Sequence, residues 1–540
     1  MFPYTPVKSN TMWPFTSILL IVVGTFCHRL GLGGVHAQSF VTISTTSGDL
    51  RGVEQDGVIL FKGVRFAEAP TGPLRWEPPV PFLSSTTQNA TVLSPACVQQ
   101  FGFATATLIE FLFNNPQDPP AENEDCLFLN VWAPSPTSST KKPVVFFIYG
   151  GSLAFGTASV PLYDGTSIAL NQDIVVVTIN YRTNVFGFPG APDLPLEGNN
   201  LGFLDQELAL EWVKLNIANF GGDPDQITIM GQSAGGFSVS GMIIRHPVDP
   251  PFRAAIIYSG DSPDTTPTSA ASFTSFNNFA SAVGCGEIVP GPLRLECLRA
   301  VSAADIRTYT NGASSGAFEP VIDNITTFDD NIQRIQSGNA ARVPFLTGNT
   351  QNDGTLFTIG DTNLTAFLNS SGFTVDGNVT ADVVRSLYPG QNDTDVIADV
   401  FRDVSFLCPA SLWTAAFVES GISSVFRYEY GAVFPDLQLF PNAGAWHSSE
   451  LQEVFGTYNA STATPNEVTL SKTFQTAIAN FIKNPDESPA PNWPKYIPGN
   501  LTQTLARLAY VGNVETDNFV QAVTSDSQDT PCTLWDALLD

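Results

Sequence analysis

The serine at position 233 has a sequence context in which serine can act as a nucleophile. It lies in a Gly-x-Ser-x-Gly pattern directly after the apolar run 227–230. A nucleophile elbow needs a strand, a sharp turn and a helix, with small residues two positions to either side so that side chains do not collide. A second match surrounds Ser314, but the residues on both sides of it resemble loop. Ser233 is therefore predicted to be a nucleophile, and Ser314 a loop serine.

A serine hydroxyl needs a base that accepts its proton. Outside the first 37 residues the chain has two histidines, His246 and His447. His246 directly precedes a proline, where a role at a helix end is expected. His447 lies far downstream in a stretch of small residues, and the order serine, acid, histidine is typical of folds with a nucleophile elbow. His447 is therefore the predicted base.

The elements that must position these residues are short runs rich in Val, Ile and Phe. The runs are continuous, as in strands buried on both faces of a mainly parallel sheet; they span 144–149, 174–179, 227–230, 254–258, 343–347 and 425–430. Apolar residues at helical spacing between 204 and 215 and between 470 and 481 predict helices. This alternation predicts an α/β fold, with helical or loop insertions around 270–340 and 355–405 at one edge of the sheet, over the active site.

The N-terminus resembles a secretory signal peptide. Lys8 precedes the apolar stretch 18–23, and small residues end at Ala37. The apolar stretch is short for a membrane span, so cleavage is expected rather than anchoring. Residues 1–37 are thus predicted to be a cleaved signal, and residues 38–540, which contain no internal repeat or linker, a single catalytic domain.

Cysteines and sequons agree with an extracellular location. Six cysteines remain beyond the signal, an even number suited to disulfides, and no CxxC pair suggests zinc. Eight glycosylation sequons begin at Asn89, Asn324, Asn363, Asn369, Asn378, Asn392, Asn459 and Asn500.

The charge balance makes nucleic acid an unfavourable partner. The chain has 24 basic and 51 acidic residues, a net charge of -27. Such a surface repels phosphate backbones. No metal, organic cofactor or stable membrane anchor is expected, and the oligomeric state is left open.

Together these motifs resemble the type-B carboxylesterase/lipase family of α/β-hydrolases, which includes cholinesterases and fungal lipases. The resemblance covers nearly the whole chain beyond the signal. It rests on the opening motif, a second signature and the lead into the elbow, at residues 61–67, 73–76, 124–131 and 219–224.

The resemblance implies an oxyanion hole and a catalytic acid. The oxyanion donors would be the backbone N–H groups of Gly151, Ser152 and Ala234. Ser152 stands where the family has a third glycine, and its Cβ narrows the site. Asp353 occupies the position of the usual glutamate and would orient the imidazole; the competing carboxylates are Glu319, Asp323 and Glu429.

The resemblance also implies three disulfides and a lid. The pairs would be Cys97–Cys126, Cys285–Cys297 and Cys408–Cys532. In fungal lipases of the family, the loop closed by the first pair covers the active site. Here that loop is rich in phenylalanine and leucine, and Phe111 and Phe113 are predicted to contact substrate. The alternative is that these aromatic residues pack permanently on the body.

The predicted function is that of a secreted serine hydrolase acting on small-molecule or lipid esters, with medium or long acyl chains preferred over acetate. The lid argument favours lipophilic esters such as those cleaved by lipases or sterol-ester hydrolases. Three alternatives remain: an esterase for phenolic (feruloyl-type) esters, a peptide hydrolase, and a non-catalytic adhesion protein of the same fold. Intact Ser233 and His447 argue against the last of these.

Overall fold

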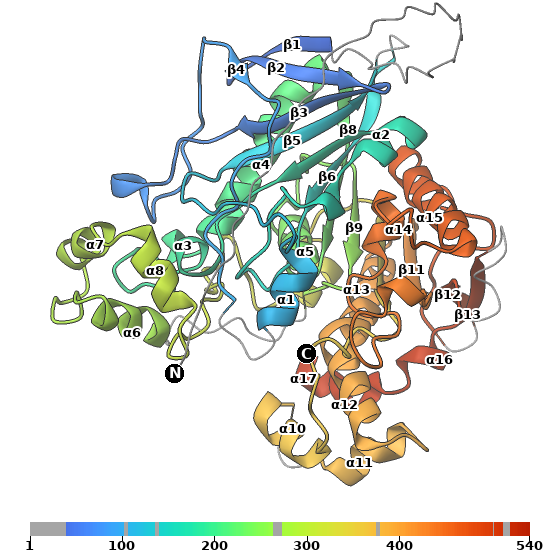
Figure 1. The fold of residues 1–540 in the computed structure, drawn as a ribbon. Coiled ribbons are helices and arrows are strands. Elements are labelled where there is room, and N and C mark those ends of the chain that lie inside the picture. Colours follow the sequence, from blue (N-terminus) through green and yellow to red (C-terminus); the bar gives the residue numbers. More distant parts are fainter. Residues whose placement is uncertain are drawn as a thin grey trace, which may run out of the picture. The chain divides into compact units, whose positions relative to one another are not determined.

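A mixed sheet of 13 strands organises the part of the chain that the computed structural model describes (Figure 1). The described residues are 39–101, 106–135, 140–262, 273–373, 379–499, 502–510 and 519–539. The predicted signal peptide and the sequons at Asn378 and Asn500 lie outside them. Residues Gln38–Asp540 form one compact unit.

The strand order places the parallel strands in the middle of the sheet. The order is β1-β2-β3-β5-β7-β6-β8-β9-β10-β11-β12-β13, and β4 pairs with β2. From β7 to β12 neighbouring strands are parallel, whereas β1, β2, β3 and β5 form an antiparallel region and β13 is antiparallel to β12. The strands are β1 (Ser39–Thr45), β2 (Gly48–Gln55), β3 (Val58–Arg65), β4 (Gln88–Asn89), β5 (Phe128–Pro134), β6 (Lys142–Ile148), β7 (Val175–Ile179), β8 (Gly222–Gln232), β9 (Ala254–Tyr258), β10 (Phe345–Thr350), β11 (Val425–Tyr430), β12 (Gln503–Leu508) and β13 (Val520–Thr524).

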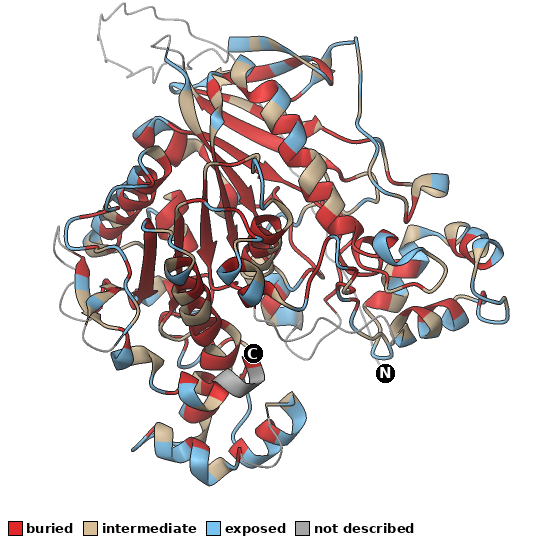
Figure 2. Ribbon diagram, turned by 180° about the vertical axis from the view of Figure 1, so that it is seen from behind, coloured by how far each residue is buried: buried red, intermediate tan, exposed pale blue. Residues whose placement is uncertain are grey.

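The predicted α/β class is confirmed, and all six predicted apolar runs correspond to strands. The runs at 254–258 and 425–430 coincide with β9 and β11, and every residue of these two strands is buried. Helices cover the sheet, and their outward faces are exposed while the central strands are buried (Figure 2).

Helices follow most of the central strands. The predicted helices near 204–215 and 470–481 are α4 and α15, and α4 ends in a tighter turn before Gly221, which has φ +82°. The helices outside the disulfide loop and the two insertions are α2 (Thr166–Gln172), α3 (Asn184–Gly187), α4 (Leu201–Asn216), α5 (Ala234–Arg245), α9 (Asn331–Gln336), α13 (Cys408–Glu419), α14 (Leu451–Phe455), α15 (Pro465–Lys483), α16 (Asp526–Asp529) and α17 (Cys532–Leu539).

Two insertions form separate groups of helices, as the sequence predicts (Figure 1). One contains α6 (Thr274–Ala282), α7 (Pro292–Arg299) and α8 (Ala303–Thr310); the other contains α10 (Leu364–Ser371), α11 (Ala381–Leu387) and α12 (Asp393–Arg402). Each has a small apolar core of its own. One expectation is wrong: residues 308–310, expected as loop before Ser314, are the last turn of α8, because Ile306 and Thr310 are buried on one face of that helix.

Three disulfides join the cysteines in the pairs that the resemblance implies. They are Cys97–Cys126, Cys285–Cys297 and Cys408–Cys532, and they span 29, 12 and 124 residues of sequence. The first closes the loop that contains α1 (Ala106–Phe113), and the third ties α17 to the start of α13.

Candidate active site

Ser233 occupies the sharp turn between β8 and α5. Its backbone has φ +55° and ψ -126°, a conformation that L-residues rarely adopt. The flanking glycines allow this turn, because a Cβ atom at Gly231 would lie 2.2 Å from the carbonyl oxygen of Gly235. A Cβ atom at Gly235 would lie 2.0 Å from the carbonyl oxygen of Ile148. The strand, turn and helix expected around Ser233 are all present.

His447 and Asp353 form a buried pair. His447 Nδ1 lies 2.8 Å from Asp353 Oδ1, and the two side chains are 3% and 0% exposed. Asp353 follows the end of β10, and its other oxygen accepts hydrogen bonds from Ser259 Oγ at 2.9 Å and from the Thr350 amide at 2.8 Å. A carboxylate at Nδ1 fixes the tautomer in which Nδ1 carries the proton and Nε2 can accept one.

The competing carboxylates are engaged elsewhere. Asp323 accepts the amide hydrogens of residues 325–327 and so stabilises its own loop. Glu429 is bonded to the Tyr510 hydroxyl and forms an ion pair with Arg507. Glu319 is exposed at the wall of the cavity. Among these four carboxylates, Asp353 contacts His447.

His246 has the position expected for a residue at a helix end. It is the C-cap of α5, and its Nε2 lies 2.9 Å from Glu207 Oε2. Burial alone would raise the pKa of Glu207, but Arg245 and His246 lower it to about 2.

Aromatic rings enclose the imidazole of His447. The Phe406 ring stacks on it with centroids 4.7 Å apart, and Phe357 meets it edge-on at 5.0 Å. Neither phenylalanine was singled out from the sequence: Phe406 lies in the helical turn Asp403–Leu407 between α12 and α13, and Phe357 lies in the loop after Asp353. The nearby carboxyl of Glu450 is fully buried; burial, and then the charge of Asp353, raise its pKa well above the usual range.

The predicted oxyanion residues lie on two elements that meet at Ser233. Gly151 and Ser152 follow β6 and line the cavity beside Ser233, and Ala234 is the first residue of α5. The N-terminus of a helix presents unsatisfied N–H groups and favours negative charge. Ser152 has φ +55°, a left-handed conformation that costs a non-glycine residue of order 1–3 kcal/mol. The predicted departure from glycine therefore coincides with a strained backbone.

A cavity of about 440 Å³ opens over Ser233 and His447. Most of its wall is apolar, and it includes Ile109 and Phe113 of α1. Phe113 packs against the Phe155 ring with centroids 6.2 Å apart. The structure differs from the expectation for Phe111, which is 48% exposed on α1 and is not among the cavity-lining residues.

The opposite wall comes from residues that the sequence did not single out. They are residues 315–318, which begin inside the second Gly-x-Ser-x-Gly match at 312–316, together with Leu356, Phe357 and Phe401. Gln100 connects this wall to the disulfide loop, because its Nε2 donates to Ser315 Oγ at 3.1 Å and to the Gly316 carbonyl at 3.2 Å. Ser314 itself is exposed. The loop after Ser314, predicted only to be a loop, therefore borders the site.

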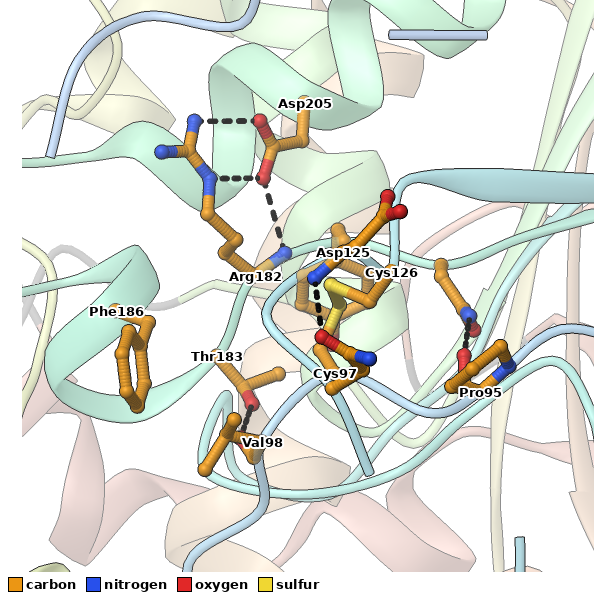
Figure 3. Close-up of a disulfide and its surroundings, with 12 residues drawn as sticks. Pro95, Cys97, Val98, Asp125, Cys126, Arg182, Thr183, Phe186 and Asp205 are labelled. Atoms are coloured by element: carbon orange, nitrogen blue, oxygen red, sulfur yellow. Dashed lines mark hydrogen bonds and ion pairs between the residues drawn. A yellow bond between two sulfur atoms is a disulfide. The ribbon is translucent and has the colours of Figure 1, made fainter. Parts of the chain in front are cut away.

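The base of the disulfide loop is fixed to the body of the protein (Figure 3). Beside the Cys97–Cys126 bond, the Thr183 hydroxyl donates to the Val98 carbonyl at 3.2 Å. The buried pair Arg182–Asp205 lies next to this contact, with Nη2 and Oδ1 2.7 Å apart. The loop therefore begins from a rigid support.

Comparisons with known proteins agree with this geometry. Residues 37–524 match the model of a family described as the carboxylesterase family. The chain is 32% identical to chlorogenic acid esterase of Aspergillus niger over 85% of its length and 86% of that protein. It is 30% identical to secreted lipase 5 of Gibberella zeae, covering 86% of this chain and 88% of that one. A solved structure titled PNB esterase superposes with a TM-score of 0.74 at 28% identity, covering 92% of this chain and 99% of that chain.

Proposed function

The chain belongs to the carboxylesterase family and is a carboxylic ester hydrolase with the α/β-hydrolase fold, and from this premise we propose that Ser233, His447 and Asp353 carry out the hydrolysis. The observation that carries the proposal is the Asp353–His447 pair beside an elbow serine in one apolar cavity. The adhesion-type alternative is set aside, because the chain is an enzyme.

Ser233 is proposed to attack the ester carbonyl while Nε2 of His447 accepts the proton from its hydroxyl. The same proton then passes to the leaving alcohol, and an acyl group remains on Ser233. Water, activated by His447 in turn, releases the acid and restores the serine. Asp353 keeps the ring in the required tautomer and stabilises the imidazolium that forms in each step.

The oxyanion is proposed to bind the backbone N–H groups of Gly151, Ser152 and Ala234. Negative charge develops on the carbonyl oxygen as the tetrahedral intermediate forms, and fixed donors in a site with little water stabilise it. The strained backbone of Ser152 supports this role, since left-handed residues at the end of a strand turn successive N–H groups toward one side.

The substrate is proposed to be an ester with a medium or long acyl chain. The aromatic and aliphatic wall of the 440 Å³ cavity, including Ile109, Phe113 and Leu356, suits an apolar chain better than an acetyl group. Similarity to a secreted lipase supports the same class.

A phenolic ester is the second candidate. The similarity to chlorogenic acid esterase favours it, and the rings that line the cavity would stack against an aromatic acid. A panel of p-nitrophenyl esters from acetate to palmitate, run beside methyl ferulate and chlorogenic acid, distinguishes the two. The highest kcat/KM on acetate would contradict both substrate classes.

The protein is proposed to be secreted after removal of residues 1–37, leaving residues 38–540 as one catalytic domain. The described chain has no helix long and apolar enough to cross a membrane. The asparagines of the six described sequons are exposed, as a glycan requires: Asn89, Asn324, Asn363, Asn369, Asn392 and Asn459. N-terminal sequencing and glycosidase digestion of secreted protein test these points.

Replacement of the nucleophile is the direct test of the mechanism. Ser233→Ala is expected to lower kcat by about 10⁴-fold or more, because no other group can form the acyl-enzyme. Ser314→Ala is the matched control and should retain nearly full activity, since that side chain is exposed in a turn. Unchanged hydrolysis by Ser233→Ala would exclude the mechanism.

A further inference from the structure

The hydrogen-bond partner of His447 Nε2 is the residue immediately before Ser233. The side-chain nitrogen of Gln232 lies 3.0 Å from His447 Nε2, and Gln232 is 2% exposed. Nδ1 of the ring is the nitrogen that faces Asp353. Nε2 is then unprotonated, so the amide must be the donor. Within the described part of the chain, no hydrogen bond joins Ser233 Oγ to the ring.

The oxygen of the same amide lies against the loop proposed to bind the oxyanion. A Cβ atom at Gly150 would lie 2.8 Å from Gln232 Oε1 and 2.7 Å from the Gln232 main-chain oxygen. Gly150 therefore provides the space that the amide occupies. The side chain is enclosed between this loop and the imidazole, at the end of β8.

We propose that Gln232 is a positioning residue, whose uncharged amide donates to Nε2 and so holds the ring of His447 neutral and in place until Nε2 turns to the hydroxyl of Ser233. The inference rests on the proposed function of His447 as the base. An amide donates to a neutral imidazole without adding charge. A carboxylate in the same place could not donate and would favour the imidazolium, which cannot act as a base.

Few ionisable groups face His447 from the elements packed around it. Asp353 contacts Nδ1, and Glu319 lies on the cavity wall. Glu450 follows in the same turn, and burial, followed by the charge of Asp353, raises its pKa well above the usual range. The rings of Phe357 and Phe406 cover the imidazole. A new charge at position 232 would therefore act on the ring through little intervening solvent.

The experiment measures kcat/KM against pH with p-nitrophenyl butyrate. In Gln232→Glu, the pH at which activity falls to half on the acidic side should rise by about one unit or more, with activity recovering at alkaline pH. In Gln232→Met, this pH should rise by less than in Gln232→Glu, because only a donor to the neutral ring is lost, while kcat falls about tenfold and KM changes little.

Gln100→Glu is the matched control, since it adds the same charge to the wall formed with residues 315–316. Its acidic limb should move less than that of Gln232→Glu. An equal shift in both variants, an unmoved limb in Gln232→Glu, or full kcat in Gln232→Met would overturn the proposal. Each of these results is measured on an active esterase, so it would leave the proposed function intact.

A histidine ¹⁵N spectrum of the unmodified protein tests the same contact without a variant. His246 and His447 are the histidines beyond residue 37, so His447→Asn assigns the two signals. At neutral pH the His447 signals should show a protonated Nδ1 and a hydrogen-bonded, unprotonated Nε2. A proton on Nε2 would overturn the proposal whether or not the Gln232 variants fold.

Discussion

At the scale of single residues, the proposed triad depends on which carboxylate contacts the imidazole of His447. Asp353 can do so although it is one methylene shorter than the glutamate usual in the family. Hydrogen bonds from Ser259 and from the Thr350 amide hold its second oxygen, so that the first faces His447. The shorter acid is thus positioned by its own loop and by the neighbouring strand end.

Asp353→Asn is expected to lower kcat by about 10⁴-fold, because an amide favours the wrong tautomer of His447. Steady-state kinetics with unchanged circular dichroism would check this result. Asp323→Asn and Glu319→Gln serve as controls, and both should lower kcat far less. If either control had the larger effect, the acid would be misassigned.

The family resemblance pointed to Asp353, which the structure places against His447, but not to the contacts that support it. Position before a glycine marked Asp353, and chain order marked His447. Gln232, Ser259 and Phe406 act through three-dimensional contacts between distant segments, and neither their types nor their spacing indicates a role.

At the scale of elements, the parallel strands and the long helices were predictable because their apolar pattern is continuous or periodic. Strands β12 and β13 were not, because these short strands, next to and at the edge of the sheet, mix polar and apolar residues. The cavity wall at residues 315–318 was also missed. It is irregular backbone tied by side-chain hydrogen bonds to Gln100, a contact that leaves no periodic signal.

Helix α1 carries the test of substrate preference. Phe113→Asp should lower kcat/KM for p-nitrophenyl palmitate about tenfold or more beyond its effect on butyrate, because it places a charge on the apolar cavity wall. Phe111→Asp is the control on the same helix, at an exposed position. Equal losses on both esters would instead indicate a folding defect.

The Phe111 variant also tests the lid. If α1 moves to meet a lipid surface, the exposed Phe111 contributes to that contact. Its loss should then affect emulsified substrates more than dissolved ones. Equal rates on both kinds of substrate would support the alternative of a permanently packed loop.

At the scale of the whole molecule, buried carboxyl groups make stability depend on pH. Glu453 of α14 is fully buried; burial, and then the charges of Glu467 and Asp436, raise its pKa from 4.5 to about 9. Burial likewise raises the pKa of Asp261 to about 7. Since the folded state retains these protons longer than the unfolded chain, stability should fall as pH rises from 4.5 toward 9.

Thermal unfolding between pH 5 and pH 9 measures this dependence. The melting temperature should decrease across the range, and Glu453→Gln should make the decrease smaller because an amide cannot ionise. Glu68→Gln, at an exposed position, should leave the slope unchanged.

Glu207 sets the acidic limit of stability. Burial alone would raise its pKa, but Arg245 and His246 lower it to about 2. The stabilisation by this carboxylate is therefore lost as pH falls from 4.5 toward 2.

The order of the strands also has a consequence in time. Ser233, Asp353 and His447 follow β8, β10 and β11, which lie on both sides of β9 in the sheet. A ribosome makes these strands one after another, so β11 and the histidine after it emerge long after the nucleophile has been made. By the proposed mechanism, a growing chain therefore cannot hydrolyse esters before His447 is added, although most of its sheet has already been made. By this mechanism the producing cell contains no active esterase until residue 447 of the 540 has been translated.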